Sequence, residues 1–137
     1  AIHETPLRLT STNNGTLNIK NGKFGIDGSS DNTKINHPIT IDGTVKLNVT
    51  GCTSHAVYNL NSGLTILGAP VINITSGGYA LYGVGVDIWG GKITAKNTSS
   101  GFVICSGGNN DIVIKNEADI TIQSGISGVQ AANASVF

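Results

Sequence analysis

The chain has 137 residues, of which 39% are hydrophobic and 12% are charged, and its eight Lys and Arg balance its eight Asp and Glu. This length suits one domain, and the composition is too apolar and too weakly charged for a disordered chain. A net charge of zero argues against a polybasic binder of nucleic acid or membrane surfaces. No apolar run is long enough to predict a transmembrane helix. We therefore expect neither nucleic-acid binding nor membrane insertion.

The residue types favour strands and tight turns. The chain contains 17 Ile, 10 Val, 14 Thr, 19 Gly and 15 Asn, but only two Glu and no Met. β-branched residues are enriched in strands, whereas Gly and Asn are enriched in turns. No long segment shows apolar residues at helical spacing. The composition predicts an all-β protein.

A pair of apolar residues separated by one position recurs along the chain at intervals of 22, 25, 22 and 26 residues. These anchor pairs are Leu17/Ile19, Ile39/Ile41, Leu64/Ile66, Val86/Ile88 and Ile112/Ile114. The second pairs that follow them are Phe24/Ile26, Leu47/Val49, Ile72/Ile74, Ile93/Ala95 and Ile120/Ile122. The third apolar positions are Ile35, Val57, Leu81, Ile104 and Val129.

Three strands per period, with alternating inward residues, indicate a repeat protein whose coils stack on one another. We predict a single right-handed parallel β-helix, or β-solenoid, of about five coils of 22–26 residues with three strands per coil; its handedness follows the usual crossover rule.

The two ends of the chain continue the pattern. Residues 1–14, with Leu7 and Leu9, are interpreted as a partial leading coil, and residues 15–137 as the repeats of one domain. Val136 lies seven residues after Val129, as Leu64 does after Val57, so we expect Val136 to open a sixth coil. Terminal coils normally need polar caps, and none is apparent. The sequence therefore suggests a fragment of a longer protein, or ends that self-associate.

Two segments carry a family resemblance. Residues 86–95 read VDIWGGKITA and residues 111–122 read DIVIKNEADITI. They resemble the xVxIxGGxVxAxG repeats of bacterial cell-surface proteins, which include adhesin-like and carbohydrate-binding-domain β-solenoids related in shape to pectate lyases. The resemblance implies a parallel β-helix and an extracellular or cell-surface location. It transfers no site residue, because the acidic calcium cluster and the catalytic bases of the lyases have no match here.

The aromatic residues of the third strands are candidate ligand-binding residues. If Val57 and Leu81 point inward, Tyr58 and Tyr82 point outward and stack in adjacent coils, as a platform for the apolar face of a sugar ring. In that arrangement His55, Tyr79 and Phe102 would lie at a turn on the inner side. The opposite strand phase would instead bury Tyr58 and Tyr82 as packing residues.

Other outward positions are also candidates. Trp89 aligns with Leu67 one coil earlier, and an exposed Leu67–Trp89 patch suggests a ligand, a domain or another copy that covers it. The alternative is a turn residue folded against the coil edge. We further expect Asn73 and Thr94 in an outward row that also holds Gly25, Asn48 and Thr121. Such a row could bind a glycan, or it could be an ordinary solvent-facing row.

Metal binding and catalysis have weaker support. Asp27 and Asp31 lie in a turn rich in oxygen atoms, but calcium takes six to eight oxygen ligands, so the pair makes only a marginal calcium site. No other cofactor is expected. A glycosidase needs two carboxylates across a cleft, and no such pair is evident.

We therefore expect a non-catalytic extracellular β-solenoid that acts in cell-surface adhesion or polysaccharide binding, with a polysaccharide or cell-surface glycan as its partner. The alternatives are a structural stalk or fibre segment that assembles through its coil ends and, more remotely, a polysaccharide-lyase-like enzyme.

Overall fold

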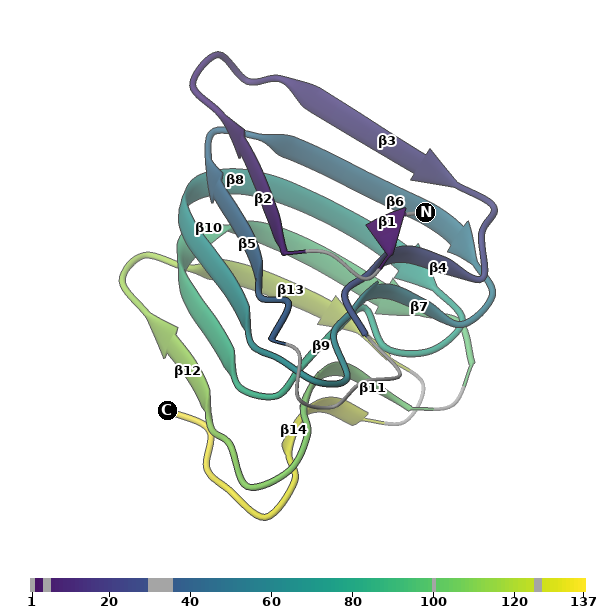
Figure 1. Cartoon of the computed structure of the whole chain (residues 1–137), viewed down its shortest axis with the longest axis vertical. Helices are drawn as coiled ribbons and strands as arrows, with labels where there is room; N and C mark the ends of the chain where they lie inside the picture. The colour runs from purple at the N-terminus through teal and green to yellow at the C-terminus, as the bar shows by residue number, and fades with distance from the viewer. Residues whose placement is uncertain (1, 4–5, 30–35, 100, 125–126) are drawn as a thin grey trace.

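The chain forms a parallel β-solenoid, as its sequence predicts, and makes about four turns (Figure 1). This computed structural model describes residues 2–3, 6–29, 36–99, 101–124 and 127–137. The described residues form fourteen strands and no helix, so this part of the chain holds no helix that could span a membrane. Every strand pairing is parallel, which is the arrangement that stacked coils require. The outer surface has three faces, each made of one strand position per coil.

The first face and the second face belong to one eight-stranded sheet that bends at a corner. The first face consists of β2 (Leu7–Ser11), β5 (Ile39–Gly43), the first half of β8 (Leu64–Ser76), the first half of β10 (Val86–Asn97) and β12 (Ile112–Lys115). The second face consists of β3 (Thr16–Lys20), β6 (Lys46–Cys52), the second halves of β8 and β10, and β13 (Asp119–Gln123).

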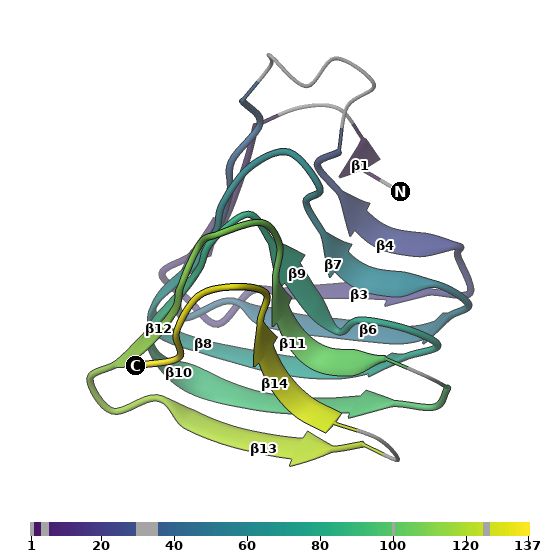
Figure 2. The same ribbon diagram turned by 90° about the horizontal axis from the view of Figure 1, so that it is seen from below.

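The third face is a six-stranded sheet of shorter strands (Figure 2). It consists of β1 (Ile2–His3), β4 (Phe24–Asp27), β7 (His55–Tyr58), β9 (Leu81–Gly83), β11 (Phe102–Ser106) and β14 (Ser127–Ala131). The two sheets enclose the interior between them. The second face therefore points away from the third, and a ligand on one does not touch the other.

The first coil differs from its prediction. Leu17 was expected to align with Ile39, but Leu17 pairs with Leu47 on the second face, and it is Leu7 that pairs with Ile39. The same shift moves Phe24 from the second face to the third, where it pairs with His55.

The first coil is longer than the later ones. It separates Leu7 from Ile39 by 32 residues, whereas later coils take 25, 22 and 26 residues. The chain therefore makes about four turns rather than about five. At the other end, Val136 does pair with Ile112, so the residues that follow β14 do begin another coil, as expected. Ile35 lies outside the described residues.

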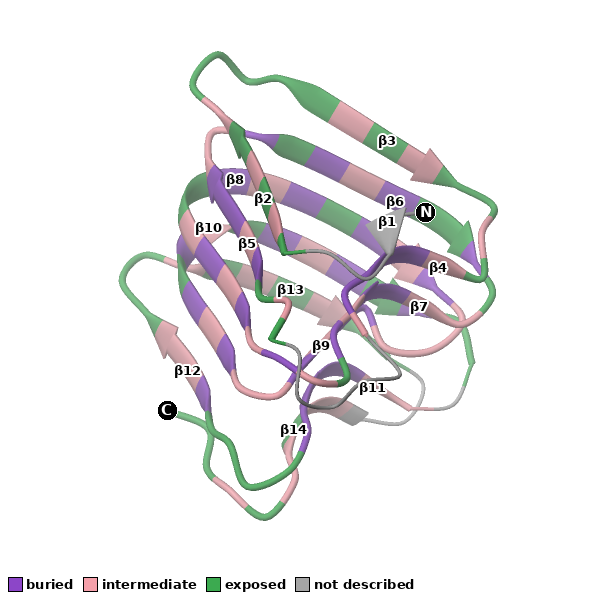
Figure 3. Ribbon diagram, in the orientation of Figure 1, coloured by how far each residue is buried: buried purple, intermediate pink, exposed green. Residues whose placement is uncertain are grey.

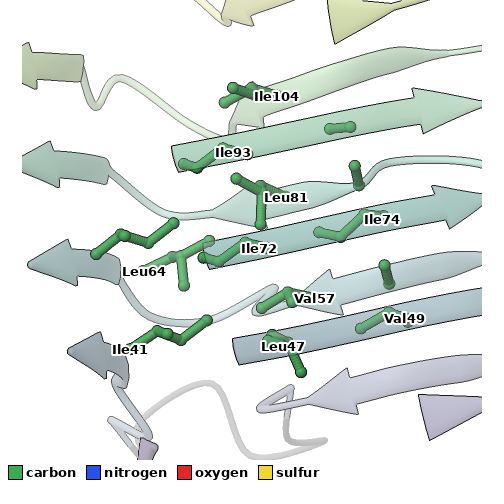
Figure 4. Packing of buried hydrophobic residues seen from close by; sticks show 14 of the residues in the cluster. Ile41, Leu47, Val49, Val57, Leu64, Ile72, Ile74, Leu81, Ile93 and Ile104 are labelled. Carbon is green, nitrogen blue, oxygen red and sulfur yellow. The ribbon is translucent and has the colours of Figure 1, made fainter. Parts of the chain in front are cut away.

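The interior is a continuous stack of aliphatic side chains (Figure 4). Ile41, Leu47, Ile72, Leu81 and Ile93 all have no exposed surface. Figure 3 shows buried positions alternating with less buried ones along β6, β8 and β10, as a pleated strand with one buried face requires. Burial of such side chains, at about 1.5–3 kcal/mol each, is the main term that stabilises the coils.

Candidate ligand-binding surface

A repeated tetrad determines which side chains the third face presents to solvent. Along β7 the two middle residues, Ala56 and Val57, are fully buried, whereas His55 and Tyr58 at its ends are partly exposed. The same order of partly exposed, buried, buried, partly exposed holds from Tyr79 to Tyr82. In both tetrads the first of the two inward residues is alanine. In the coil before, that position is Gly25, where even a Cβ would lie 2.8 Å from Val49 Cγ1.

Five ring side chains gather on the outside of this face, and we name them the aromatic ladder. Its members are Phe24, His55, Tyr58, Tyr79 and Tyr82. Of the two strand phases that the sequence left open, the structure shows the one with Tyr58 and Tyr82 outward. These two residues pair in register, and their ring centroids lie 4.9 Å apart. The expectation that His55 and Tyr79 point inward is wrong. Their rings stack on each other at 4.8 Å and contact the two tyrosines, while Phe102 is also only partly buried.

The rings of the ladder lie over one another and do not lie edge to edge in one plane. Centroid separations run from 4.5 Å for His55–Tyr58 to 5.6 Å for Phe24–Tyr58, with interplanar angles of 26° and 23°. Rings lying side by side in one plane cannot approach so closely. Three of the ring contacts are stacked, with interplanar angles of 23–29°, and the other three are tilted at 34–47°. The ladder therefore uses part of each ring face internally. It shows solvent the ring edges and the uncovered parts of the faces, rather than the flat platform expected from the sequence.

His55 is held as a neutral imidazole within the ladder. Its Nδ1 accepts a hydrogen bond from the backbone N–H of Tyr79 at 3.1 Å, which requires an unprotonated nitrogen. Burial lowers the pKa of His55, and the nearby Lys23 ammonium lowers it further, against an opposing effect of Asp27. Burial also raises the pKa of Tyr58 and of Tyr82. At neutral pH the ladder is thus uncharged, which suits an uncharged, amphipathic ligand.

Two other side chains occupy the row of Tyr58 and Tyr82. Asp27 pairs in register with Tyr58 and is 5% exposed, and its Oδ1 accepts hydrogen bonds from the backbone N–H and the hydroxyl of Ser29. Cys105 pairs with Tyr82, is buried and is a free thiol, as is Cys52; burial raises the pKa of Cys105.

The calcium candidate gains no support. Asp31 lies outside the described residues, and the described part of the chain holds no group of three or more His, Cys, Asp or Glu able to ligate a metal. Asp27 is the only member of the candidate pair that the structure describes.

A groove of about 760 Å³ lies at the corner between the first and second faces. It is lined by residues that include Gly68, Trp89, Gly90, Lys92 and Glu117. Trp89 is 44% exposed, which confirms that it faces solvent.

Trp89 also pairs in register with Leu67, as expected, but Leu67 is partly buried and does not line the groove. The Lys115 side chain lies over the Trp89 ring, with its Nζ 5.7 Å from the ring centroid. The groove is thus a second, separate candidate site.

Asn73 and Thr94 lie on the second face, in adjacent strands and in register. Their outward row begins at Asn18 instead of the expected Gly25, because of the shifted first coil. The complete row is Asn18, Asn48, Asn73, Thr94 and Thr121. The structure therefore does not bring Asn73 and Thr94 together with Tyr58 and Tyr82.

These features define the class of protein as a parallel β-solenoid with an exposed aromatic ladder. No protein-family model, curated protein sequence or solved structure matches the chain. The residues that sequence reasoning missed are Phe24, His55 and Tyr79. A repeated tetrad in the sequence could have identified His55 and Tyr79. It reads HAVY at residues 55–58 and YALY at residues 79–82, and in both a small and a large apolar residue lie between two ring side chains.

Proposed function

We propose that this chain is a non-catalytic, extracellular β-solenoid that binds polysaccharide through the aromatic ladder. The observation that carries the proposal is the ladder itself, five partly exposed rings in contact across three coils. A contiguous group of exposed apolar side chains on a small protein usually marks a surface that contacts a ligand or a partner. The resemblance of residues 86–95 to repeats of bacterial cell-surface proteins supports a cell-surface location and a role in adhesion.

The ladder suits an extended sugar chain because both are amphipathic. Pyranose rings offer C–H groups on their faces and hydroxyls at their edges. The uncovered parts of the Tyr58 and Tyr82 rings can contact the C–H groups, while the phenolic hydroxyls can donate to and accept from sugar hydroxyls. Coils repeat at about 4.8 Å, so the ladder presents the same contact at regular steps along the solenoid. A repeating ligand can then engage several coils at once.

A lyase or glycosidase has less support in the described residues. Asp27 and Asp42 are both buried, and Asp42 is engaged by Arg8 in an ion pair of 2.6 Å. A catalytic pair would need two carboxylates facing each other across a cleft. The carboxylates that line the groove, Glu117 and Asp119, are only two positions apart and Asp119 pairs with Lys92 at 3.4 Å. Binding without catalysis is therefore the function that we propose.

A stalk or fibre segment is the second candidate, and one observation favours it. The outermost described coils carry core residues that are only partly buried, including Leu9, Leu17, Ile114 and Ile120. Another solenoid coil stacked on either end would bury them further. Light scattering across a concentration series tests this role: growth of rods end to end supports it, and a constant monomer mass at high concentration argues against it.

The direct test of polysaccharide binding is calorimetric titration with soluble neutral glycans, such as xyloglucan, mannan and mixed-linkage glucan. Replacing both Tyr58 and Tyr82 by Ala is expected to weaken binding about tenfold, since each aromatic contact is worth about 0.5–1.5 kcal/mol. Phe137→Ala is the matched control, because Phe137 is 68% exposed but contributes no ring to the ladder.

Trp89→Ala separates the two candidate sites. Weaker binding in Trp89→Ala alone would move the glycan site from the aromatic ladder to the corner groove. Unchanged binding in both the tyrosine variant and Trp89→Ala would refute both site assignments, and no binding to any glycan would refute the proposed function.

A further inference from the structure

The second face concentrates positive charge although the chain as a whole is neutral. Five parallel strands make up this face (Figure 2). Their register places the outward residues in three rows that run across the strands. The outer rows hold Lys46 and Lys92 on one side and Lys20 and Lys96 on the other. The only carboxylate on these rows is Asp119, which lies beside Lys92.

The lysines flank the Asn/Thr row from both sides. Lys46 and Lys92 are two coils apart, or about 10 Å, and Lys20 and Lys96 are three coils apart, or about 14 Å. The two outer rows are four residues apart along each strand, or about 13 Å. The result is a flat, polar strip along the solenoid axis with ammonium groups along both margins.

The middle of the strip is ordered by its own hydrogen bonds. The Asn48 side-chain amide donates to Asn18 Oδ1 at 2.8 Å, and that of Asn73 donates to Asn48 Oδ1 at 2.9 Å. These bonds fix the amide planes, so a ligand meets preorganised polar groups and little side-chain entropy is lost when it binds.

The ammonium groups of the lysines along both margins are available to bind a ligand. No ion pair within the described residues includes Lys20, Lys46 or Lys96, and all three side chains are exposed. The Lys92–Asp119 pair is itself exposed, with 64% and 60% of the two side chains accessible, so it holds Lys92 only weakly. Asp27 and Asp42 are buried away from this face, whereas Asp119 lies on it beside Lys92 and the exposed Glu117 lines the adjoining groove together with Lys92.

We propose that the second face binds an anionic polysaccharide, with the sugar chain running along the solenoid axis over the Asn/Thr row. Its sulfate or carboxylate groups reach the lysines on either margin, and its hydroxyls hydrogen-bond Asn48, Asn73 and Thr94. A polymer is the fitting ligand because the charges repeat over the length of the solenoid instead of converging on one point. This second site is independent of the aromatic ladder, which takes neutral sugar surfaces.

The test compares binding of dextran sulfate with binding of uncharged dextran of the same length, at several salt concentrations. The chain is expected to bind dextran sulfate in a saturable, salt-dependent manner and not to bind dextran. The double variant Lys46→Gln, Lys96→Gln is expected to lower the affinity about tenfold or more at low salt and to reduce the steepness of the salt dependence. Its melting temperature should not change, because both side chains are exposed.

A control with the same change in net charge excludes a general charge effect. Asn109→Asp with Gln130→Glu also lowers the net charge by two, at exposed positions outside the second face. This control should keep nearly the full affinity for dextran sulfate. An equal loss in the control and in the lysine variant would overturn the proposal, and so would the absence of saturable binding.

Two further measurements identify the ligand class and separate the two sites. Tighter binding of a single-stranded oligonucleotide than of dextran sulfate, at the same salt, would overturn the assignment to a polysaccharide. The tyrosine variant should keep its affinity for dextran sulfate, and the lysine variant should keep any affinity for neutral glycans. Failure of one site is thereby distinguished from failure of the other.

Discussion

The imidazole of His55 accepts a hydrogen bond from the backbone N–H of Tyr79 in the next coil, and the two rings stack with their centroids 4.8 Å apart. One side chain thus satisfies a backbone donor of its neighbour and supports the aromatic ladder at the same point. The hydrogen bond requires the imidazole to keep Nδ1 unprotonated. The ladder is therefore sensitive to mild acid.

The first prediction concerns that sensitivity. Because the pKa of His55 is lowered in the folded state, the unfolded chain binds more protons below the ordinary His pKa of about 6.5. Stability is thus full above about pH 6.5 and falls as the pH drops through the lower folded pKa. His55→Gln, whose amide oxygen can also accept the bond, should flatten the change in melting temperature between pH 7 and pH 5. A wild-type melting temperature that stays constant over this range would contradict the prediction.

The second prediction concerns Asp42 on the first face. Hydrogen bonds from the Thr10 and Arg8 side chains hold the pKa of Asp42 below its ordinary value. The stabilisation is present above the unfolded Asp pKa of about 3.9 and is lost as the pH falls through the lower folded value. Asp42→Asn should therefore weaken the dependence of stability on pH below about pH 4. The change in melting temperature between pH 7 and pH 5, which depends on His55, should stay the same.

Arg8→Ala tests the same ion pair from its other side. The Arg8 side chain is 70% exposed, so its removal should lower the free energy of unfolding by no more than about 1 kcal/mol at neutral pH. Thermal unfolding followed by circular dichroism from pH 2 to pH 7 measures both variants. A loss of several kcal/mol in Arg8→Ala would show that the ion pair is far less screened than its exposure indicates.

The third prediction concerns the corner between the first and second faces. Gly68 and Gly90 are stacked there with φ of 78° and 112°, and a Cβ at Gly90 would overlap the carbonyl oxygen of Gly68. Gly90→Ala should therefore lower the free energy of unfolding by about 3 kcal/mol or more.

Gly85→Ala is the matched control for Gly90→Ala. Gly85 also has a positive φ, of 88°, but a Cβ there would meet no atom closer than 3.8 Å. This variant should lose only the backbone term of about 1–2 kcal/mol. Urea unfolding compares the two, and equal losses would show that the stacked backbone at the corner can move apart without cost.

The fourth prediction concerns the arrangement of the rings in the aromatic ladder. It tests whether ligand binding depends on the positions of the rings as well as on their number. Gly107 has a backbone conformation open to any residue, and a Cβ there would overlap the Tyr82 hydroxyl. Gly107→Ala should therefore displace the Tyr82 ring while leaving every aromatic residue in place. If neutral glycans bind the ladder, this variant should weaken their binding severalfold, in the direction of Tyr82→Ala. A glycan affinity equal to that of the wild type would show that Tyr82 does not need its observed position.

The fold class follows from local patterns. β-branched residues at alternate positions define strands with one buried face, and their recurrence at 22–26 residues allows that face to be buried only by stacking coils. The register of Trp89 with Leu67 and of Ile112 with Val136 could be predicted for the same reason, since evenly spaced coils keep equivalent positions aligned.

The first coil and the aromatic ladder could not be predicted in this way. An apolar pair looks the same on all three faces, so spacing alone could not show that Leu17 belongs with Leu47 instead of Ile39. Strict alternation likewise placed His55 inward, because the sequence does not reveal that Ala56 and Val57 both face the core.

The sequence by itself determined that the chain coils and that its alternating aliphatic residues line the interior, because burial of β-branched residues at period two leaves few alternatives. Only the tertiary structure decided which outward side chains meet. Closing each coil brings residues 21–32 positions apart to within about 5 Å. In β7, the two inward residues Ala56 and Val57 turn the flanking His55 and Tyr58 rings to the same surface. The aromatic ladder and the lysine margins of the second face both arise from that closure.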